Sequence, residues 1–429
     1  LYKEKKFETQ EAQKWWVSQS LKEFRSKLNE LNINLEIIKT ETYKSFFEKI
    51  FKQKNISIYW NKTYEPNYLK FDEYLLQQFT SKKIEYKIFK GNILNEFQEI
   101  KKGDGTPFKV FTPFWRTAEK FYSEKIPIKN KKVFKCSKKV SYFKNKINED
   151  DIYPKKNWIK KFNNYWKPNE ENALKEFKNF LNKRISDYSH ARNFPYIVGT
   201  SKLSPYIKHG QIHVETIWEE CAKLKNLTIN KFIAEIGWRE FNHSLINYFP
   251  HMLKENYSKK FNNFPWEKNI KFLSAWKKGK TGYPIVDAGM RELYSTGWMH
   301  NRVRMIVGSL LVKHLLINWT EGEKHFKNCL LDYNEANNVS GWQWVAGSGA
   351  DAAPYFRIFN PILQGEKFDK EGYYVKQWVP ELKHVPKKFI HKPWELNDEK
   401  ILKLGFDYPN PIVIHEKARQ KALNAFKKI

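Results

Sequence analysis

The sequence predicts a chain in three parts: a Rossmann-like α/β domain with a parallel sheet over residues 1–105, a long connection over 106–169, and an all-helical domain over 170–429. Helical and strand-like patterns alternate in the first hundred residues, at the spacing of a parallel α/β layer. Beyond residue 170, apolar residues recur mainly at helical spacing. A length of 429 residues with 41% apolar residues is enough for two or three domains with sizeable cores.

Each element of the first part follows from its apolar pattern. The helical spacing of 3.6 residues predicts helices over 11–31, 44–54 and 72–83. Short apolar runs predict strands over 35–39, 56–60 and 85–89. The glycine-containing turn at 102–107 ends this part.

Residues 120–170 are rich in Lys, Asn, Ser and Pro and lack clear periodicity, which is typical of a connection between domains. Helical faces then dominate the chain, and they predict helices over 170–183, 218–224, 229–248 and 299–319. The last of these is the longest apolar stretch, but it contains Lys313 and His314 and is too short to span a membrane.

The composition points to a polyanionic partner. Lys and Arg number 77 against 47 Asp and Glu, a net charge of +30, and aromatic residues make up 17%. This combination suits a protein that binds nucleic acid or stacks on a ring system, although a general preference for surface lysine would give the same charge. The three cysteines lie far apart, which argues against disulfides and structural zinc and favours a cytoplasmic location.

Four segments of the helical part carry chemistry. Residues 199–205 combine a glycine, hydroxyls and a lysine, which suit phosphate or merely cap a helix. Residues 235–239 place an acid, a tryptophan and an arginine within about one helical turn, which suits a heterocycle or a simple ion pair. Polar groups in 298–305 should be paired or functional. Residues 332–354 join tryptophans to small residues that allow close approach of a flat molecule, or a packed core.

Together these segments resemble the photolyase/cryptochrome flavoprotein family, from about residue 11 to residue 394 and most densely over 281–293, 296–305 and 341–368. The resemblance implies that the helical domain binds FAD. Carried over residue by residue, the FAD site would consist of Tyr188, Thr200, Ser201, Leu203, Ser204, Phe232, Glu235, Arg239, Trp298, Asn301, Arg304, Asp332, Asn334 and Asn338. Arg304 and Asp332 would form an ion pair beside the flavin, and Asn334 stands where the family usually has Asp.

The same resemblance implies a lesion pocket and an electron relay. The pocket for a pyrimidine dimer would include Arg192, Glu235, Trp238, Arg239, Asn301, Arg302, Met305, Trp344 and Gln364. The residues Glu235, Trp238 and Met305 favour the class I cyclobutane pyrimidine dimer branch. The catalytic group would comprise Glu235, Asn338 and the tryptophan chain Trp342, Trp319 and Trp266.

We therefore expect a carbon–carbon lyase that repairs cyclobutane dimers in DNA under blue light, by electron transfer from excited reduced FAD to a flipped-out dimer. The alternatives are a cryptochrome-like photoreceptor that binds FAD without repair, and a nucleic-acid-binding module without a cofactor. The family resemblance implies a monomer without metal or membrane contact, and a second antenna chromophore, folate or deazaflavin, is possible. The family's opening strand motif is not found, so we expect an α/β domain that lacks its first strands and is compromised.

Overall fold

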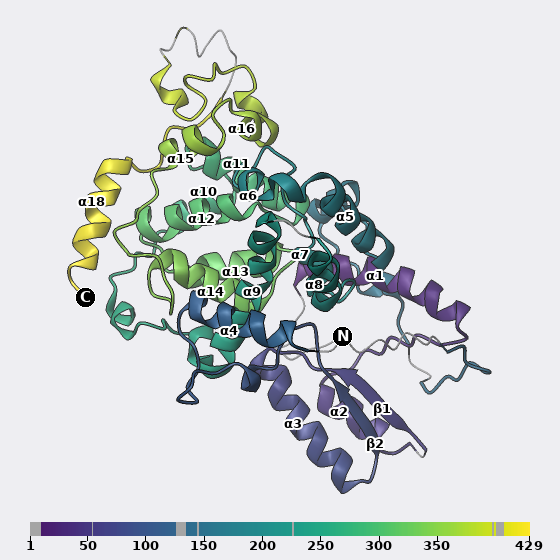
Figure 1. Ribbon diagram of the computed structural model, residues 1–429. Coiled ribbons are helices and arrows are strands. Elements are labelled where there is room, and N and C mark those ends of the chain that lie inside the picture. The colour runs from purple at the N-terminus through teal and green to yellow at the C-terminus, as the bar shows by residue number, and fades with distance from the viewer. Residues whose placement is uncertain are drawn as a thin grey trace.

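A computed structural model describes residues 10–53, 55–125, 134–143, 146–224, 227–396, Glu399 and 407–429. The described residues form a small α/β unit at one end of the molecule and a larger helical body (Figure 1). The predicted combination of an α/β domain and a largely helical domain is confirmed. None of the helices in the described ranges is long and apolar enough to cross a membrane.

The α/β unit is built around one strand–helix–strand crossover. Strands β1 (Ser57–Asn61) and β2 (Glu85–Phe89) pair in parallel, and α3 (Pro66–Ser81) connects them. The ring of Trp60 on β1 packs against Phe79 of α3 at a centroid distance of 5.5 Å. Helix α2 (Tyr43–Ile50) packs beside α3 and completes the apolar layer under the sheet. The parallel arrangement follows from the long helical connection between the strands.

The strand predicted over 35–39 is wrong. This stretch is extended, but it joins no sheet within the described residues. Its polar groups pair instead with residues further along the chain: the Ile37 carbonyl accepts from the Ile147 amide at 3.0 Å, and Glu36 forms an ion pair with Lys146. An extended segment that bonds to a loop has the same sequence pattern as a strand in a sheet. In both cases successive side chains point to opposite sides of the backbone.

The first helix, α1 (Glu11–Glu30), packs into the helical body. Trp15 and Trp16 are fully buried there. Trp15 packs edge-on against Phe162 at 5.4 Å, and Trp16 against Tyr206 at 5.0 Å. The helix that opens the chain therefore contributes to the core of the domain that follows it.

Most of the remaining chain is helical. The α-helices of this part are α4 (Phe111–Ser123), α5 (Glu170–Lys183), α6 (Tyr188–Ala191), α7 (Ser204–Lys208), α8 (Val214–Ala222), α9 (Leu227–Tyr248), α10 (Ile270–Lys277), α11 (Pro284–Thr296), α12 (Asn301–Ser309), α13 (Trp319–Cys329), α14 (Glu335–Ala346), α15 (Pro361–Phe368), α16 (Tyr373–Trp378) and α18 (His415–Phe426). Helix α4 falls inside the predicted connection and packs on α9.

The single helix predicted over 299–319 is also wrong. Helix α12 ends at Ser309 and passes into a π-helical turn, Leu310–His314. The chain then turns at Leu316, whose φ is 51°, and α13 begins at Trp319. Residues 306–317 are all buried, Lys313 and His314 included, so the pattern of apolar and polar positions could not show the break.

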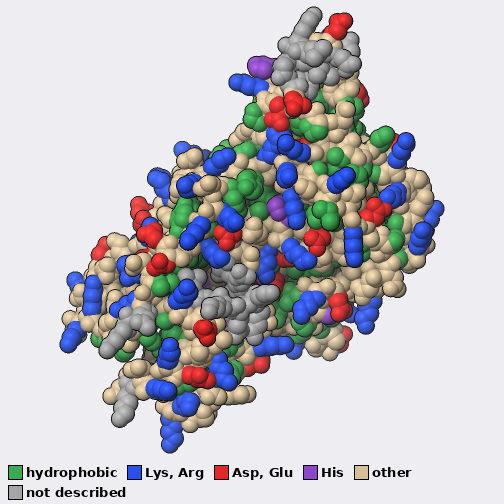
Figure 2. Space-filling model, turned by 180° about the vertical axis from the view of Figure 1, so that it is seen from behind, with side chains coloured by type: hydrophobic (Ala, Val, Ile, Leu, Met, Phe, Trp, Pro, Cys, Tyr) green, Lys and Arg blue, Asp and Glu red, His purple; other side chains and the backbone are tan. Residues whose placement is uncertain are grey.

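Basic side chains are distributed widely over the surface. Figure 2 shows Lys and Arg spread across the whole visible face, with Asp and Glu among them, rather than gathered in one patch. Much of the net charge of +30 is therefore a general property of the surface. Specific recognition of a ligand must therefore come from a smaller set of residues. The helical packing brings such residues together around one cavity.

Candidate functional site

A cavity of about 870 Å³ opens between α9, α12 and α14, closed on one side by the loop before α7. Each helix lines it with residues three and four positions apart, which lie on one helical face. Helix α14 and its N-cap contribute Asn334, Asn337, Asn338, Gly341, Trp342 and Val345. Helix α9 contributes Phe232, Glu235, Ile236, Trp238, Arg239 and Asn242. The volume lies at the upper end for small-molecule sites.

The predicted site residues converge on this cavity. All fourteen residues predicted to contact FAD line it. Eight of the nine predicted lesion contacts line it as well. The exception, Gln364, lies in a neighbouring pocket of about 480 Å³, which shares Asn193 and Arg302 with the main cavity.

The ion pair predicted between Arg304 and Asp332 is present. Nη2 of Arg304 lies 2.8 Å from Oδ2 of Asp332, and the Ser204 hydroxyl donates to the same oxygen at 2.6 Å. The indole N–H of Trp298 donates in turn to Ser204 at 3.3 Å. These contacts fix a carboxylate in the cavity wall and leave its other oxygen available.

A second ion pair joins Arg192 to Glu235 across the mouth of the cavity. Burial lowers the pKa of Arg192, but the charge of Glu235, the nearby Tyr188 and the hydrogen bond to Glu235 together leave this pKa above its ordinary value. The Arg192 guanidinium also lies over the ring of Tyr188, 5.2 Å from its centroid. The Glu235 side chain stays about one-third exposed, so the pair borders the opening rather than the floor.

Aromatic and cationic side chains form the other side of the opening. The ring of Trp238 stacks on Phe111 of α4, with centroids 3.8 Å apart and planes 8° apart. Arg302 donates to the Asn193 side chain at 2.6 Å and lies over the ring of Phe368 at 4.5 Å. These contacts hold a flat indole and a planar cation rigidly at the cavity.

The three tryptophans predicted as a relay differ in depth. Trp342 is buried in the cavity wall, and its ring contacts in the described residues are with Phe326 at 5.0 Å and Trp276 at 6.1 Å. Trp319 is buried and donates its indole N–H to Asn256 at 2.9 Å. Trp266 is half-buried. Trp342 thus lines the cavity, Trp319 is buried and Trp266 is partly exposed, and their order as a relay stays a prediction.

Both ends of the Asn334 side-chain amide form hydrogen bonds with neighbouring residues. Its side-chain oxygen caps α14 by accepting from the Asn337 amide at 3.0 Å, which turns its NH₂ group toward Nε2 of His243 at 3.1 Å. Burial holds the pKa of His243 well below its usual value, so this imidazole is neutral and accepts the bond. On the same face, Asn338 donates to Glu323 at 3.1 Å.

Sequence reasoning missed several residues of the lining. The cations Lys208 and Lys231 line the cavity, but lysine is so common in this chain that neither of them was distinctive. Asn337 also lines it and accepts from Asn242 at 3.0 Å. Its position three residues after Asn334 on the helix could have revealed it.

The comparisons with known proteins agree with this geometry. Residues 232–428 match the model of the FAD binding domain of DNA photolyase, and residues 2–131 match the DNA photolyase model. A deoxyribodipyrimidine photo-lyase from Agrobacterium fabrum is 40% identical over 97% of this chain and 88% of its own length. The chain belongs to the photolyase/cryptochrome family.

Two solved structures of this family resemble the chain over nearly its whole length. A bacterial class III photolyase from Agrobacterium tumefaciens has a TM-score of 0.92 and 38% identity, with 98% of this chain and 89% of that chain covered. A cryptochrome from Synechocystis has a TM-score of 0.83 and 27% identity, with 97% and 89% covered. The class I interpretation stays a prediction, since the first of these structures is of a class III enzyme.

The cavity fits the family's flavin. Four buried polar atoms among its lining residues have no hydrogen-bond partner in the described part of the chain: Arg302 Nε, Asp332 Oδ1, Ser340 Oγ and Trp342 Nε1. Leaving such atoms unsatisfied is costly, and a polar ligand would satisfy them. The hydroxyls of Thr200 and Ser201 supply donors suited to a diphosphate, while the Ser204 hydroxyl already donates to Asp332.

Proposed function

We propose that the chain repairs cyclobutane pyrimidine dimers in DNA in a light-driven reaction, with FAD held in the cavity between α9, α12 and α14. The observation that carries the proposal is the convergence of two residue sets on one cavity: all of the predicted flavin contacts and all but one of the predicted lesion contacts. A ligand in the depth of this cavity would lie next to one at its opening, as electron transfer requires.

The wall residues would hold the cofactor by distinct contacts. The hydroxyls near α7 would bind the diphosphate, and the Arg304–Asp332 pair and Asn338 would flank the flavin ring. Reduced FAD would supply, on illumination, the electron that splits the cyclobutane ring, and the electron would return to the cofactor once the ring has opened, so that repair consumes no reductant. A fixed ion pair near the ring is useful there because it offsets charge without reorganising.

The opening would receive the lesion. Surface lysines would attract the phosphates of the damaged strand, and the dimer would leave the helix because its stacking is already weakened. Trp238, held on Phe111, would pack against the dimer, and Glu235 would accept a hydrogen bond from a ring N–H. Arg192 would orient that carboxylate, since the two form an ion pair.

The relay tryptophans would restore the reduced state. Electrons would pass from Trp266 at the surface through Trp319 to Trp342 in the cavity wall. Substituting Trp319 by Phe should slow the photoreduction of oxidised flavin while leaving repair by chemically reduced protein intact.

The test is direct. Reduced holoprotein is illuminated with an oligonucleotide that carries one cyclobutane dimer, and loss of the dimer is followed against a dark sample. Light-dependent loss supports the proposal, and its absence in FAD-loaded protein refutes it. Glu235→Gln should lower the yield of repair per absorbed photon, whereas Glu219→Gln, an exposed change on α8, should not.

The similarity to the Synechocystis cryptochrome keeps one alternative open: a photoreceptor that binds FAD without repair. Photoreduction of the flavin without preference for dimer-containing DNA would favour it. A colourless preparation would instead indicate the cofactor-free nucleic-acid-binding module. The antenna chromophore, the monomeric state and the cytoplasmic location stay predictions.

A further inference from the structure

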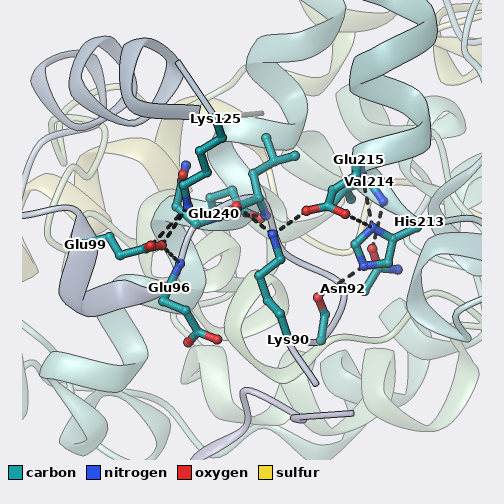
Figure 3. A network of polar contacts seen from close by, with 12 residues as sticks. Lys90, Asn92, Glu96, Glu99, Lys125, His213, Val214, Glu215 and Glu240 are labelled. Carbon is teal, nitrogen blue, oxygen red and sulfur yellow. Dashed lines mark hydrogen bonds and ion pairs between the residues drawn. The ribbon is translucent and has the colours of Figure 1, made fainter. Parts of the chain in front are cut away.

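The chain that leaves strand β2 enters the helical body as an irregular, largely buried stretch, residues 90–97, which we call the docking segment. Side-chain and backbone groups of the helical body satisfy its polar groups (Figure 3). The Asn92 side chain donates to the carbonyls of Ile207 and Ile212 and accepts from the Val214 amide. His213 bonds the Gly91 carbonyl at 3.2 Å. The α/β unit is thus anchored by polar contacts specific to this segment.

Glu240 on α9 is central to this anchorage. Its Oε2 accepts from the amides of Leu94 and Asn95 at 3.0 and 3.2 Å, although the side chain is only 3% exposed. Without Glu240, these two buried amides would have to find other partners. Its Oε1 has no hydrogen-bond partner among the described residues and lies 3.6 Å from Nη1 of Arg239.

Arg239 links the segment to the cavity. It lines the cavity, yet its Nη1 donates to the backbone carbonyl of Asn92 at 2.6 Å. Of the acidic side chains, it is Glu240 that lies within ion-pair distance of this guanidinium in the described residues. The Glu240 carboxylate and the Asn92 carbonyl therefore fix the position of Arg239 in the cavity wall. Both groups belong to the interface between the α/β unit and the helical body.

We propose that Glu240 is a positioning residue: by seating the docking segment and pairing with Arg239, it couples the α/β unit to the affinity of the cavity for its ligand. This rests on the proposed function only in taking FAD as that ligand. FAD binding and the seating of residues 90–97 then stabilise each other, because a coupling between two sites is reciprocal.

A double-mutant cycle tests the coupling in the purified holoprotein. We expect Glu240→Gln to weaken FAD binding about tenfold, which corresponds to about 1.4 kcal/mol. Arg239→Gln should weaken it similarly, and the double variant little more than either alone. Glu215→Gln is the matched control: it removes the partner of Lys90 in the same segment without touching Arg239, and should change the FAD dissociation constant less than twofold.

Independent effects of the two substitutions on FAD binding would overturn the proposal, as would a normal FAD affinity in Glu240→Gln. If that variant does not fold, the wild-type protein gives the same test by hydrogen exchange. Removing FAD should speed exchange of the Leu94 and Asn95 amides, which lie outside the cavity lining, more than exchange in α18. Equal changes would refute the coupling. Both assays need only FAD, so a chain that binds FAD but repairs nothing would leave this inference standing.

Discussion

Gly322 in α13 lies against the ring of Trp342, the innermost tryptophan of the proposed relay. A Cβ added at Gly322 would lie 2.2 Å from Cη2 of that ring and 2.6 Å from Cζ2 and Cζ3. Carbon atoms in contact prefer separations of about 3.5–4.0 Å. Gly322→Ala therefore forces the ring and the helix apart by roughly 1.5 Å. Phe326 and Trp276 hold the ring on other sides, so the free direction is toward the cavity.

Two effects on stability oppose each other in this variant. Overpacking a buried site typically costs about 1–3 kcal/mol, while alanine favours a helix over glycine by about 1 kcal/mol. In the cofactor-free protein the ring can move toward the cavity and relieve the strain, so the unfolding free energy should change by less than about 1 kcal/mol. Bound flavin closes the direction of escape, so the full strain of about 1–3 kcal/mol should appear as FAD affinity weakened about 5- to 150-fold.

The measurement is a titration of cofactor-free protein with FAD, beside thermal unfolding of the same samples. Lys324→Ala on the exposed side of α13 is the control and should change neither value appreciably. An FAD affinity within twofold of wild type in Gly322→Ala would show that the Trp342 ring is not held as described.

Three further changes test other parts of the site. Asp332→Asn removes the charge that faces Arg304 and should cost about 1.5 kcal/mol in denaturant unfolding, since Arg304 is partly exposed. Burial raises the pKa of Glu292 from 4.5 to about 7. The contribution of Glu292 to stability is therefore complete below pH 4.5 and falls by roughly 3 kcal/mol as the pH rises through 7. Unfolding free energies measured from pH 4 to 8 should fall less steeply in Glu292→Gln than in the wild type. Arg302→Ala and Trp238→Ala should reduce the preference for dimer-containing DNA in competition binding, whereas exposed-lysine changes should weaken binding to both DNAs and flatten its salt dependence; equal losses after all changes would contradict this division.

Local signals predicted much of the fold correctly. Helix α5 begins after Asn169, which caps it by accepting from the Asn172 amide, and both its ends match the prediction. Strand β2 also matches, because its apolar run lies between a helix end and a turn. The residues of the cavity lining were predicted by resemblance to the family, and those on α9 and α14 lie three and four positions apart on the helical faces that line the cavity.

The remaining features depend on contacts between distant parts of the chain. Sequence pattern cannot tell that Ile37 pairs with Ile147 rather than with a strand, or that a fully buried apolar run is broken at Leu316. Gln364 was assigned to the lesion pocket by resemblance, but the packing of α15 places it in the neighbouring pocket. The sequence does not distinguish Glu240 from other acidic residues on helices. Its hydrogen bond to the buried Leu94 amide is seen only in the structure.

The packing of α1 has a consequence for synthesis of the chain. The indole N–H of Trp16 donates to Gln211, 195 residues further along. At typical translation rates of about 5–20 residues per second, roughly 10–40 s pass between the synthesis of Trp16 and that of Gln211. During this interval the apolar face of α1, with Trp15 and Trp16, has no core to enter. The yield of recombinant protein should therefore rise at lower growth temperature or with added chaperones. Substitutions at Trp15 and Trp16 should change this yield although both residues lie away from the cavity.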